Sequence, residues 1–149
     1  MKEIPLTKGK VALVDDDDFD ELSKFKWFFS KGYALKSEDR YSTEIIMHRR
    51  IMNAPDGMDT DHINHNGLDN RRENLRVCTR SENLMNRGKL KNNTSGYKGV
   101  SWNKNSKKWQ THIRVNGKKI YLGNFKDKEE AYKAYCDASI KYHGDFSKV

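Results

Sequence analysis

The chain has 149 residues, of which 35% are hydrophobic and 34% are charged. This length and composition predict one domain or two very small ones and exclude a single large core. No apolar run approaches the ~20 residues of a membrane-spanning helix, and the first residues lack the apolar stretch of a signal peptide. We therefore expect a cytoplasmic protein that is not secreted and has no membrane partner.

The two cysteines and the net charge further narrow the class of protein that this sequence can encode. Cys78 and Cys136 form no Cys-x-x-Cys pair, so neither a zinc ribbon nor a disulfide framework is predicted. The net charge is +8 and is unevenly distributed. Residues 94–149 carry 12 basic against 5 acidic side chains, whereas residues 1–60 carry 10 against 12. The basic excess near the C-terminus indicates a polyanionic partner, although a basic protein alone is weak evidence for one.

The first third of the chain predicts short strands and short helices. Ile4–Val14 is rich in β-forming residues and reads as a strand or a hairpin. The aspartates at 15–18 suit the N-terminus of a helix over Phe19–Phe25, because the helix dipole favours negative charge there. A calcium loop is the alternative, but its glycine and final glutamate are missing. Two strands and a brief helix are expected at Trp27–Leu35, Thr43–Met47 and His48–Asn53.

Residues 56–93 form a dense polar stretch with the expected order strand, long loop, strand, helix. Asp61 and His62 close the first strand. Thr79 and Glu82 form a capping box that opens the helix, and Gly88 ends it. Asn83 then lies one turn into this helix.

These side chains have the right chemistry for phosphodiester hydrolysis. Oxygens of Asp61 and Asn83 suit one hard cation, with water and phosphate completing an octahedral Mg²⁺ site. In an extended strand His62 points away from Asp61, which leaves it available as a general base. A buried Asn74 is expected to bond the loop or the histidine backbone. Each residue also has a structural alternative. His62 could be a partly buried histidine, and Asp61 could cap or turn the chain. Asn83 could be solvated on its helix, and Asn74 could hold the loop through an Asx-type bond.

At these residues the sequence resembles the HNH endonucleases, the ββα-metal nucleases of phage and intron homing enzymes. The resemblance runs from about His48 to Arg87, through Asp61-His62-Ile63-Asn64, Gly67, Leu68-Asp69-Asn70-Arg71, Glu73-Asn74-Leu75-Arg76 and Thr79-x-Ser81-Glu82-Asn83. It implies that His62 is the general base, that Asn74 is the central orienting residue and that Asp61 and Asn83 hold Mg²⁺ (or Mn²⁺). It also implies 5′-phosphate and 3′-hydroxyl products. The third family position is often His but is Asn83 here, as in the phage homing branch.

From residue 94 the pattern changes to three strands and a helix. Residues 91–96 are the best linker, and strands are expected at Lys98–Trp102, Trp109–Val115 and Lys119–Gly123, with an Asn-Gly hairpin turn between the last two. A helix should run from the capping box at Asp127 to Gly144, with one face made of Ala131, Ala134, Tyr135, Ala138 and Tyr142. Because side chains alternate along a strand, one face of the sheet packs on this helix and the other is open, basic and aromatic.

This last third is similar to the Apetala-two (ethylene-response-factor) DNA-binding domain. The matching segments are Ser95-Gly96-Tyr97-Lys98-Gly99-Val100-Ser101-Trp102, Lys108-Trp109, His112-Ile113-Arg114, Tyr121-Leu122-Gly123-Asn124-Phe125, Ala131-Tyr132-x-Ala134-Tyr135 and His143-Gly144. The resemblance implies DNA contacts from Lys98, Ser101, Asn103, His112, Arg114, Lys119 and Tyr121. Several plant arginine positions are Lys, Ser or Asn here and His112 replaces an acidic residue, so the plant target site is not assumed. A basic solvated sheet is the structural alternative.

Together these features predict an α+β chain with two domains. Residues 1–93 form an HNH endonuclease domain, a ββα-metal unit at about 44–90 with an N-terminal α/β extension, and residues 94–149 form a three-stranded antiparallel sheet plus helix that binds double-stranded DNA. We expect a site-specific, homing-type endonuclease of phage or bacteria, a monomer or weak dimer. The alternatives are a non-catalytic DNA-binding regulator with a degenerate nuclease fold and a nonspecific toxin nuclease. The role of residues 1–45 stays open.

Overall fold

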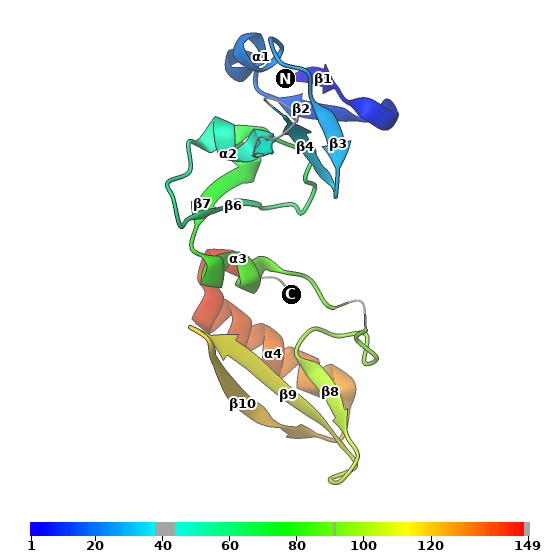
Figure 1. Ribbon diagram of the computed structural model, residues 1–149. Helices are drawn as coiled ribbons and strands as arrows, with labels where there is room; N and C mark the ends of the chain where they lie inside the picture. Colours follow the sequence, from blue (N-terminus) through cyan, green and yellow to red (C-terminus); the bar gives the residue numbers. More distant parts are fainter. Residues whose placement is uncertain (38–43, 91, 148–149) are drawn as a thin grey trace. The chain divides into compact units, whose positions relative to one another are not determined.

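The computed structural model describes residues 1–37, 44–90 and 92–147. They pack into two compact units, Met1–Arg80 and Ser81–Val149, each of which is described by itself. Both combine short helices with small antiparallel sheets, which confirms the α+β class (Figure 1). The predicted domain boundary after residue 93 lies inside the second unit and stays a prediction. Within the ranges given above, no helix is long and apolar enough to cross a membrane.

The first unit opens with a hairpin followed by a helix. Strands β1 (Lys2–Pro5) and β2 (Val11–Val14) pair antiparallel around the 3₁₀ turn η1 (Thr7–Gly9). Helix α1 (Asp16–Leu22) begins three residues earlier than predicted. The reason is that three of the four aspartates form its first turn, where the helix dipole stabilises them, instead of preceding it.

One predicted strand proves to be a hairpin. The stretch Trp27–Leu35 was expected to be a single strand, but it holds β3 (Phe28–Ser30) and the start of β4 (Tyr33–Lys36), which pair antiparallel. Lys31 and Gly32 both have positive φ, 50° and 93°, which closes a two-residue turn. The signal was the glycine in the middle of the run.

The third strand of that sheet and a short helix complete the scaffold. Strand β5 (Ile45–Ile46) pairs with β4, and helix α2 (Met47–Met52) ends at Asn53, whose φ of 44° is a left-handed C-cap. Thr43, the predicted start of this strand, lies outside the described residues. The first-unit core consists of Ile4, Leu6, Ala12, Val14, Leu22, Trp27, Ala34, Met47, Ile51 and Leu75.

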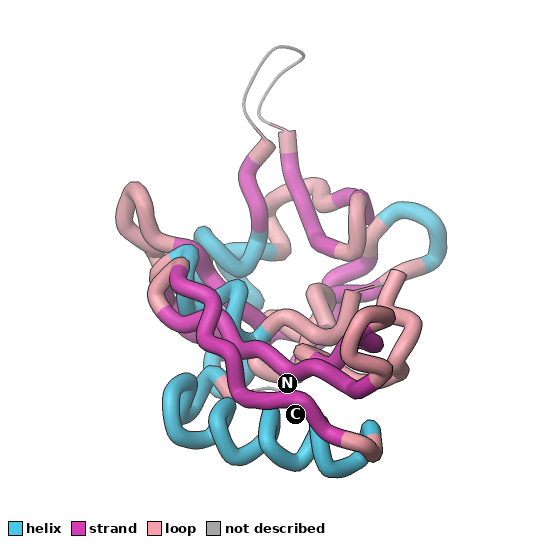
Figure 2. The backbone as a smooth tube through the Cα atoms, turned by 90° about the horizontal axis from the view of Figure 1, so that it is seen from below, coloured by secondary structure: helices cyan, strands magenta, loops and turns pink. Residues whose placement is uncertain are grey.

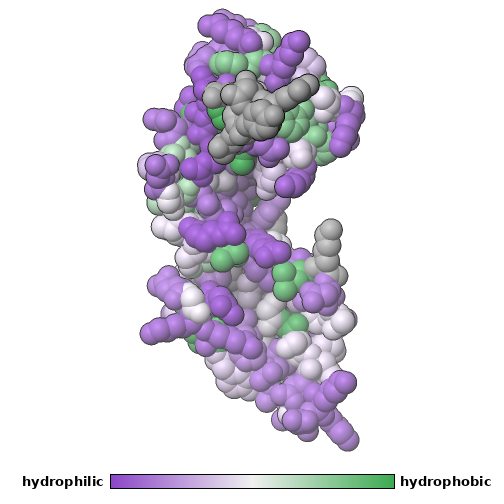
Figure 3. Space-filling view, in the orientation of Figure 1, coloured by the Kyte–Doolittle hydropathy of each residue, from purple (hydrophilic) through white to green (hydrophobic). Residues whose placement is uncertain are grey.

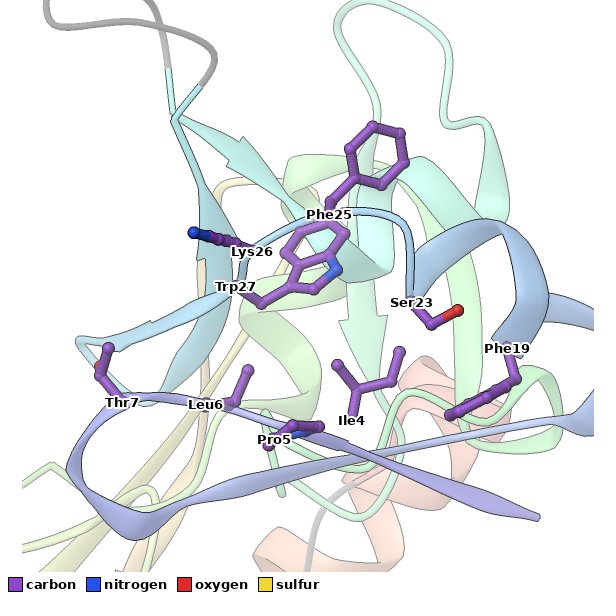
Figure 4. Close-up of a pocket in the computed structure, with 9 residues that line it drawn as sticks. All are labelled: Ile4, Pro5, Leu6, Thr7, Phe19, Ser23, Phe25, Lys26 and Trp27. Carbon is purple, nitrogen blue, oxygen red and sulfur yellow. The ribbon is translucent and has the colours of Figure 1, made fainter.

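A hollow of about 420 Å³ lies beside this core. Figure 4 shows Ile4 and Phe19 on one side of it and Trp27 on the other. The Trp27 indole donates to the Leu22 carbonyl at 2.8 Å, so this side chain ties the chain after α1 to the helix itself.

A second hairpin carries the end of the first unit. Strands β6 (Asp59–His62) and β7 (Leu75–Cys78) pair antiparallel, with Asp61 opposite Arg76 and His62 opposite Leu75. A long polar loop with the 3₁₀ turn η2 (Arg72–Asn74) joins them.

The second unit is a three-stranded sheet with a helix along one face (Figures 1 and 2). Strands β8 (Val100–Asn103), β9 (Lys108–Val115) and β10 (Lys118–Phe125) lie in the order β10-β9-β8, and α4 (Lys128–His143) follows. The Asp127 side chain accepts bonds from the amides of Glu129 and Glu130 and so caps the first turn of α4. Helix α3 (Arg80–Asn86) precedes the sheet, and η3 (Gly144–Phe146) ends the described chain.

The packed face of the sheet matches the predicted alternation. Thr111 and Ile113 are buried, and Ile113 packs on Tyr135 and Ala138 of α4. Tyr142 was expected on the buried helix face, but it is exposed. His143 occupies that place instead, because its Nε2 reaches the Arg114 carbonyl at 3.0 Å and so anchors the last turn to β9.

Candidate functional site

The end of β6 presents two chemically different side chains to opposite sides of one strand. Asp61 and His62 are successive residues in extended backbone, so their side chains emerge on opposite faces. Both are buried, with 8% and 5% of their surface exposed. A buried carboxylate and a buried imidazole need polar partners, and each has them.

His62 is oriented by Asn70, a fully buried residue of the loop. Its Nε2 lies 3.2 Å from Asn70 Oδ1, while Asn70 Nδ2 donates to the Leu68 carbonyl at 3.3 Å. This second bond fixes the amide with its oxygen towards the imidazole, so Nε2 carries the hydrogen and Nδ1 the lone pair. Burial lowers the pKa of His62, although the bond to Asn70 and the nearby carboxylates of Asp61 and Asp69 oppose this, so the neutral form of the ring is favoured.

Two further rings enclose His62. His48 lies with its ring centroid 4.7 Å away at 81°, and Tyr33 lies at 5.8 Å. His48 is 6% exposed, its Nδ1 has no hydrogen-bond partner within the described part of the chain, and burial lowers its pKa to about 3. His48 therefore stays neutral and packs against the candidate base.

Asn74 holds the loop rather than the imidazole. Its Oδ1 accepts from the Asn64 amide at 3.0 Å, its Nδ2 donates to the Asp69 carbonyl at 2.8 Å, and its own carbonyl accepts from Ile63. Of the two partners expected for this residue, the loop is the one observed. The amide that touches the imidazole belongs to Asn70, which lies in the stretch that resembles the HNH endonucleases but was not among the predicted site residues.

The same loop is fastened to the N-terminal hairpin. Leu13 of β2 donates to the Leu68 carbonyl and accepts from the Asn70 amide, both at 2.8 Å. The Arg72 guanidinium reaches Asp18 of α1 at 2.7 and 2.8 Å. Gly67 leaves no room for a side chain, because an added Cβ would lie 2.4 Å from the Gly32 carbonyl. Residues far apart in sequence thus fix the loop that orients His62.

Asp61 is paired with its cross-strand neighbour. Its Oδ2 accepts from Arg76 Nε at 3.0 Å and Nη2 at 2.8 Å. The two side chains are 9% and 16% exposed. A carboxylate oxygen is a suitable ligand for a hard cation, so the donor chemistry of Asp61 fits Mg²⁺. Asn83 belongs to α3 of the second unit, so its pairing with Asp61 stays a prediction. Within the described residues, no group of three His, Cys, Asp or Glu side chains suits a metal ion.

The open face of the second-unit sheet brings five of the seven predicted DNA contacts together. His112 pairs with Tyr121 across β9 and β10, Arg114 pairs with Lys119, and Ser101 of β8 pairs with Gln110. Arg114, Lys119 and Tyr121 are exposed, and the rings of His112 and Tyr121 lie 5.4 Å apart. Burial lowers the pKa of His112, and the positive charge of Lys119 lowers it further.

The other two predicted contacts serve local structure. Asn103 Oδ1 accepts from the amides of Asn105 and Ser106 and so holds the β8–β9 turn. Lys98 Nζ donates to the Met85 carbonyl at 2.7 Å. Gln110 and Lys108 share the open face by alternation, and that signal was available in the sequence.

The fold and these sites define a two-part chain, an imidazole–carboxylate hairpin followed by a small basic sheet. A model described as HNH endonuclease matches residues 53–85, and one described as AP2 domain matches residues 95–145. Uncharacterized HNH endonuclease L560 of Acanthamoeba polyphaga mimivirus is 28% identical over 147 residues, 94% of this chain and 74% of that protein. Protein 3.8 of Escherichia phage T7 is 33% identical over 96 residues, 63% of this chain and 77% of that protein. The chain belongs to the HNH endonuclease family and carries an AP2 domain.

The AP2 match extends to plant proteins. APETALA2-like protein 2 of Oryza sativa subsp. indica is 39% identical over 51 residues, which cover 34% of this chain and 12% of that protein. No solved structure gave a significant match. Family membership therefore rests on sequence, and the site geometry rests on the contacts given above.

Proposed function

We propose that the chain is a metal-dependent, site-specific DNA endonuclease that hydrolyses one phosphodiester bond per site. The observation that carries this proposal is the buried imidazole of His62, which the contact of its Nε2 with Asn70 Oδ1 at 3.2 Å holds in place. A buried neutral histidine with one nitrogen immobilised has the form that a general base needs. Its neighbour Asp61 supplies negative charge on the other face of the strand.

In this proposal each residue has one role. His62 Nδ1 takes a proton from the attacking water, Asn70 and Asn74 hold the imidazole and its loop, and Asp61 and Asn83 bind Mg²⁺ or Mn²⁺. When bound, the ion supplies a Lewis acid that stabilises charge on the phosphate and on the leaving 3′-oxygen. One site cuts one strand, so a monomer nicks, and a double-strand break needs two copies or a second event.

The second unit gives the proposed enzyme its site preference. A small antiparallel sheet fits the DNA major groove, where Arg and Lys read guanine. Arg114 and His112 lie on the central strand β9, opposite Lys119 and Tyr121 of β10, and Ser101 lies on β8. Relatives from a phage and a giant virus support a mobile, homing-type element acting on DNA in the cytoplasm.

A plasmid-nicking assay with Mg²⁺ tests this function. Wild type is expected to convert supercoiled plasmid to the nicked form, with no conversion in EDTA. His62→Asn removes the basic nitrogen and should reduce the rate by roughly 10²–10⁴-fold, the usual contribution of a general base. His65→Asn is the matched control, since His65 is an exposed histidine of the same loop and asparagine tolerates its φ of 64°. Equal nicking by wild type and His62→Asn would contradict the role of His62, and an absence of Mg²⁺-dependent nicking by wild type would favour a non-catalytic DNA-binding regulator.

A further inference from the structure

Arg76 forms an ion pair with the carboxylate that the proposed function assigns to the metal. Its Nε and Nη2 both donate to one oxygen, Asp61 Oδ2, and both side chains are largely buried. Buried ion pairs differ from exposed ones, because removing one partner leaves a charge that water does not solvate. Arg76 therefore neutralises Asp61 in the metal-free protein.

The position of Arg76 follows from the hairpin register. Asp61 and Arg76 are directly opposite each other on β6 and β7, where Cβ atoms are about 5 Å apart. Any cation that binds Asp61 must share or displace a guanidinium that the backbone already holds beside it. Two positive groups on one carboxylate repel each other, so the affinity of Asp61 for a metal includes the free energy of loosening this pair.

We propose that Arg76 is a built-in competitor of the divalent cation: it holds the Asp61 carboxylate in place without metal, and it sets the metal affinity by yielding that carboxylate. Arg76 is thus a positioning residue that acts through Asp61. The inference rests on the proposed function, in which Asp61 is a metal ligand, and it adds the residue that regulates that ligand.

Removing Arg76 has opposite effects under this proposal and under a merely structural role. If Arg76 only supported the fold, Arg76→Leu would disorder the site and weaken metal binding. If Arg76 competes with the metal, Arg76→Leu should bind Mn²⁺ on the order of ten-fold more tightly, as expected when a charged hydrogen-bonded competitor is lost. The metal-free variant should also melt at a lower temperature than wild type, and saturating Mn²⁺ should raise its Tm more than that of wild type.

The experiment is a Mn²⁺ titration of the full chain without DNA, followed by the EPR signal of the free ion. Arg80→Leu is the matched control, because Arg80 pairs with Asp59 on the same strand at 3.1 Å but is 76% exposed. It removes the same charge nearby without touching Asp61, so its affinity should stay within two-fold of wild type. Arg76→Lys, which keeps the charge, should restore near-wild-type affinity.

The outcomes separate the two proposals. If Arg76→Leu binds Mn²⁺ no more tightly than Arg80→Leu, the competitor role is wrong even though Asp61 remains a ligand. If Asp61→Asn binds Mn²⁺ as well as wild type, the metal assignment itself fails. Arg76→Gln keeps a hydrogen bond without the charge and is predicted to behave like Arg76→Leu, so it decides the question if the leucine variant does not fold.

Discussion

Burial in the first unit shifts the pKa of His48 far from its value in solution. His48 is enclosed by His62 and Tyr33, and burial lowers its pKa to about 3. Protonating it in the folded protein is therefore unfavourable, whereas in the unfolded chain it titrates near 6.5. A histidine with a lowered folded-state pKa favours folding fully above the unfolded value and progressively less below it.

The first prediction is that His48 makes the protein less stable as the pH falls below about 6.5. Between pH 7 and pH 5.5 the unfolded state binds the proton and the folded state does not, so His48 should make the free energy of unfolding about 1 kcal/mol smaller at the lower pH. His48→Phe keeps a ring against His62 and should remove that share of the pH dependence. Urea denaturation of both proteins at the two pH values measures it. An unchanged pH dependence in the variant would contradict the assignment.

The second prediction concerns the partner of the imidazole. Asn70→Leu keeps the volume but removes the acceptor for Nε2, so the tautomer and the ring angle are no longer fixed. Nicking should slow by about ten-fold or more, as when a supporting hydrogen bond to a functional histidine is lost. DNA binding in EDTA should be unchanged, and a gel-shift titration checks this. Loss of both properties together would indicate a folding defect instead.

The elements of the second unit meet at a glycine. Gly99 has a φ of 75°, and a Cβ there would lie 2.1 Å from the Tyr135 ring and 2.8 Å from the His112 carbonyl. The start of β8 therefore approaches both α4 and β9 more closely than any other residue type allows. This contact sets how the helix lies against the sheet.

The third prediction compares two glycines with similar backbone. Gly99→Ala and Gly117→Ala both place a side chain at positive φ, 75° and 78°, but nothing lies within 4 Å of the second Cβ. Gly117→Ala should cost about 1 kcal/mol from the backbone alone, and Gly99→Ala roughly 2–3 kcal/mol more from overpacking. Thermal melts of the two variants measure the difference. Equal melting temperatures would contradict the close approach.

Element types were predictable to the extent that they depend on local sequence. Three predicted features depend only on neighbouring residues, and the structure has all of them: the Asn-Gly turn, the Asp127 cap and the alternation in β9. The split of the predicted strand Trp27–Leu35 into a hairpin depended on positive φ at Gly32, which the glycine signals, and at Lys31, which propensity alone does not reveal. The partners of His62 depended on tertiary contacts: the backbone amide of Asn70 bonds to the carbonyl of Leu13, a contact that no local pattern encodes.

At the scale of the whole molecule the charge is concentrated where DNA contact is proposed. The last 56 residues hold most of the net +8, and hydrophilic side chains cover much of the face shown in Figure 3. Binding driven by phosphate contacts releases counterions and weakens as salt rises. The exposed pair Arg114 and Lys119 on the open sheet face should account for part of this dependence.

The fourth prediction measures that part. Arg114→Ala is expected to weaken specific DNA binding by roughly 1–3 kcal/mol if the arginine reads a base, whereas Lys119→Ala should lower the salt slope by about one if the lysine contacts phosphate. Lys133→Ala is the control, because Lys133 is an exposed residue of α4, the helix on the other face of the sheet. Fluorescence anisotropy at several salt concentrations gives both quantities. If Lys133→Ala equals the two sheet variants, general charge rather than the sheet face is responsible.

The bonds between β2 and the loop after His62 determine which segments of the chain can be transferred to another protein as a unit. The segment that matches the nuclease model is residues 53–85, yet Leu13, Asp18 and Gly32 hold its loop in place. Residues 53–85 alone therefore do not contain all the contacts that hold the candidate nuclease site. A graft onto another DNA reader has to carry the first hairpin with it, whereas the AP2 sheet, with its own helix and caps, is the part that can be exchanged.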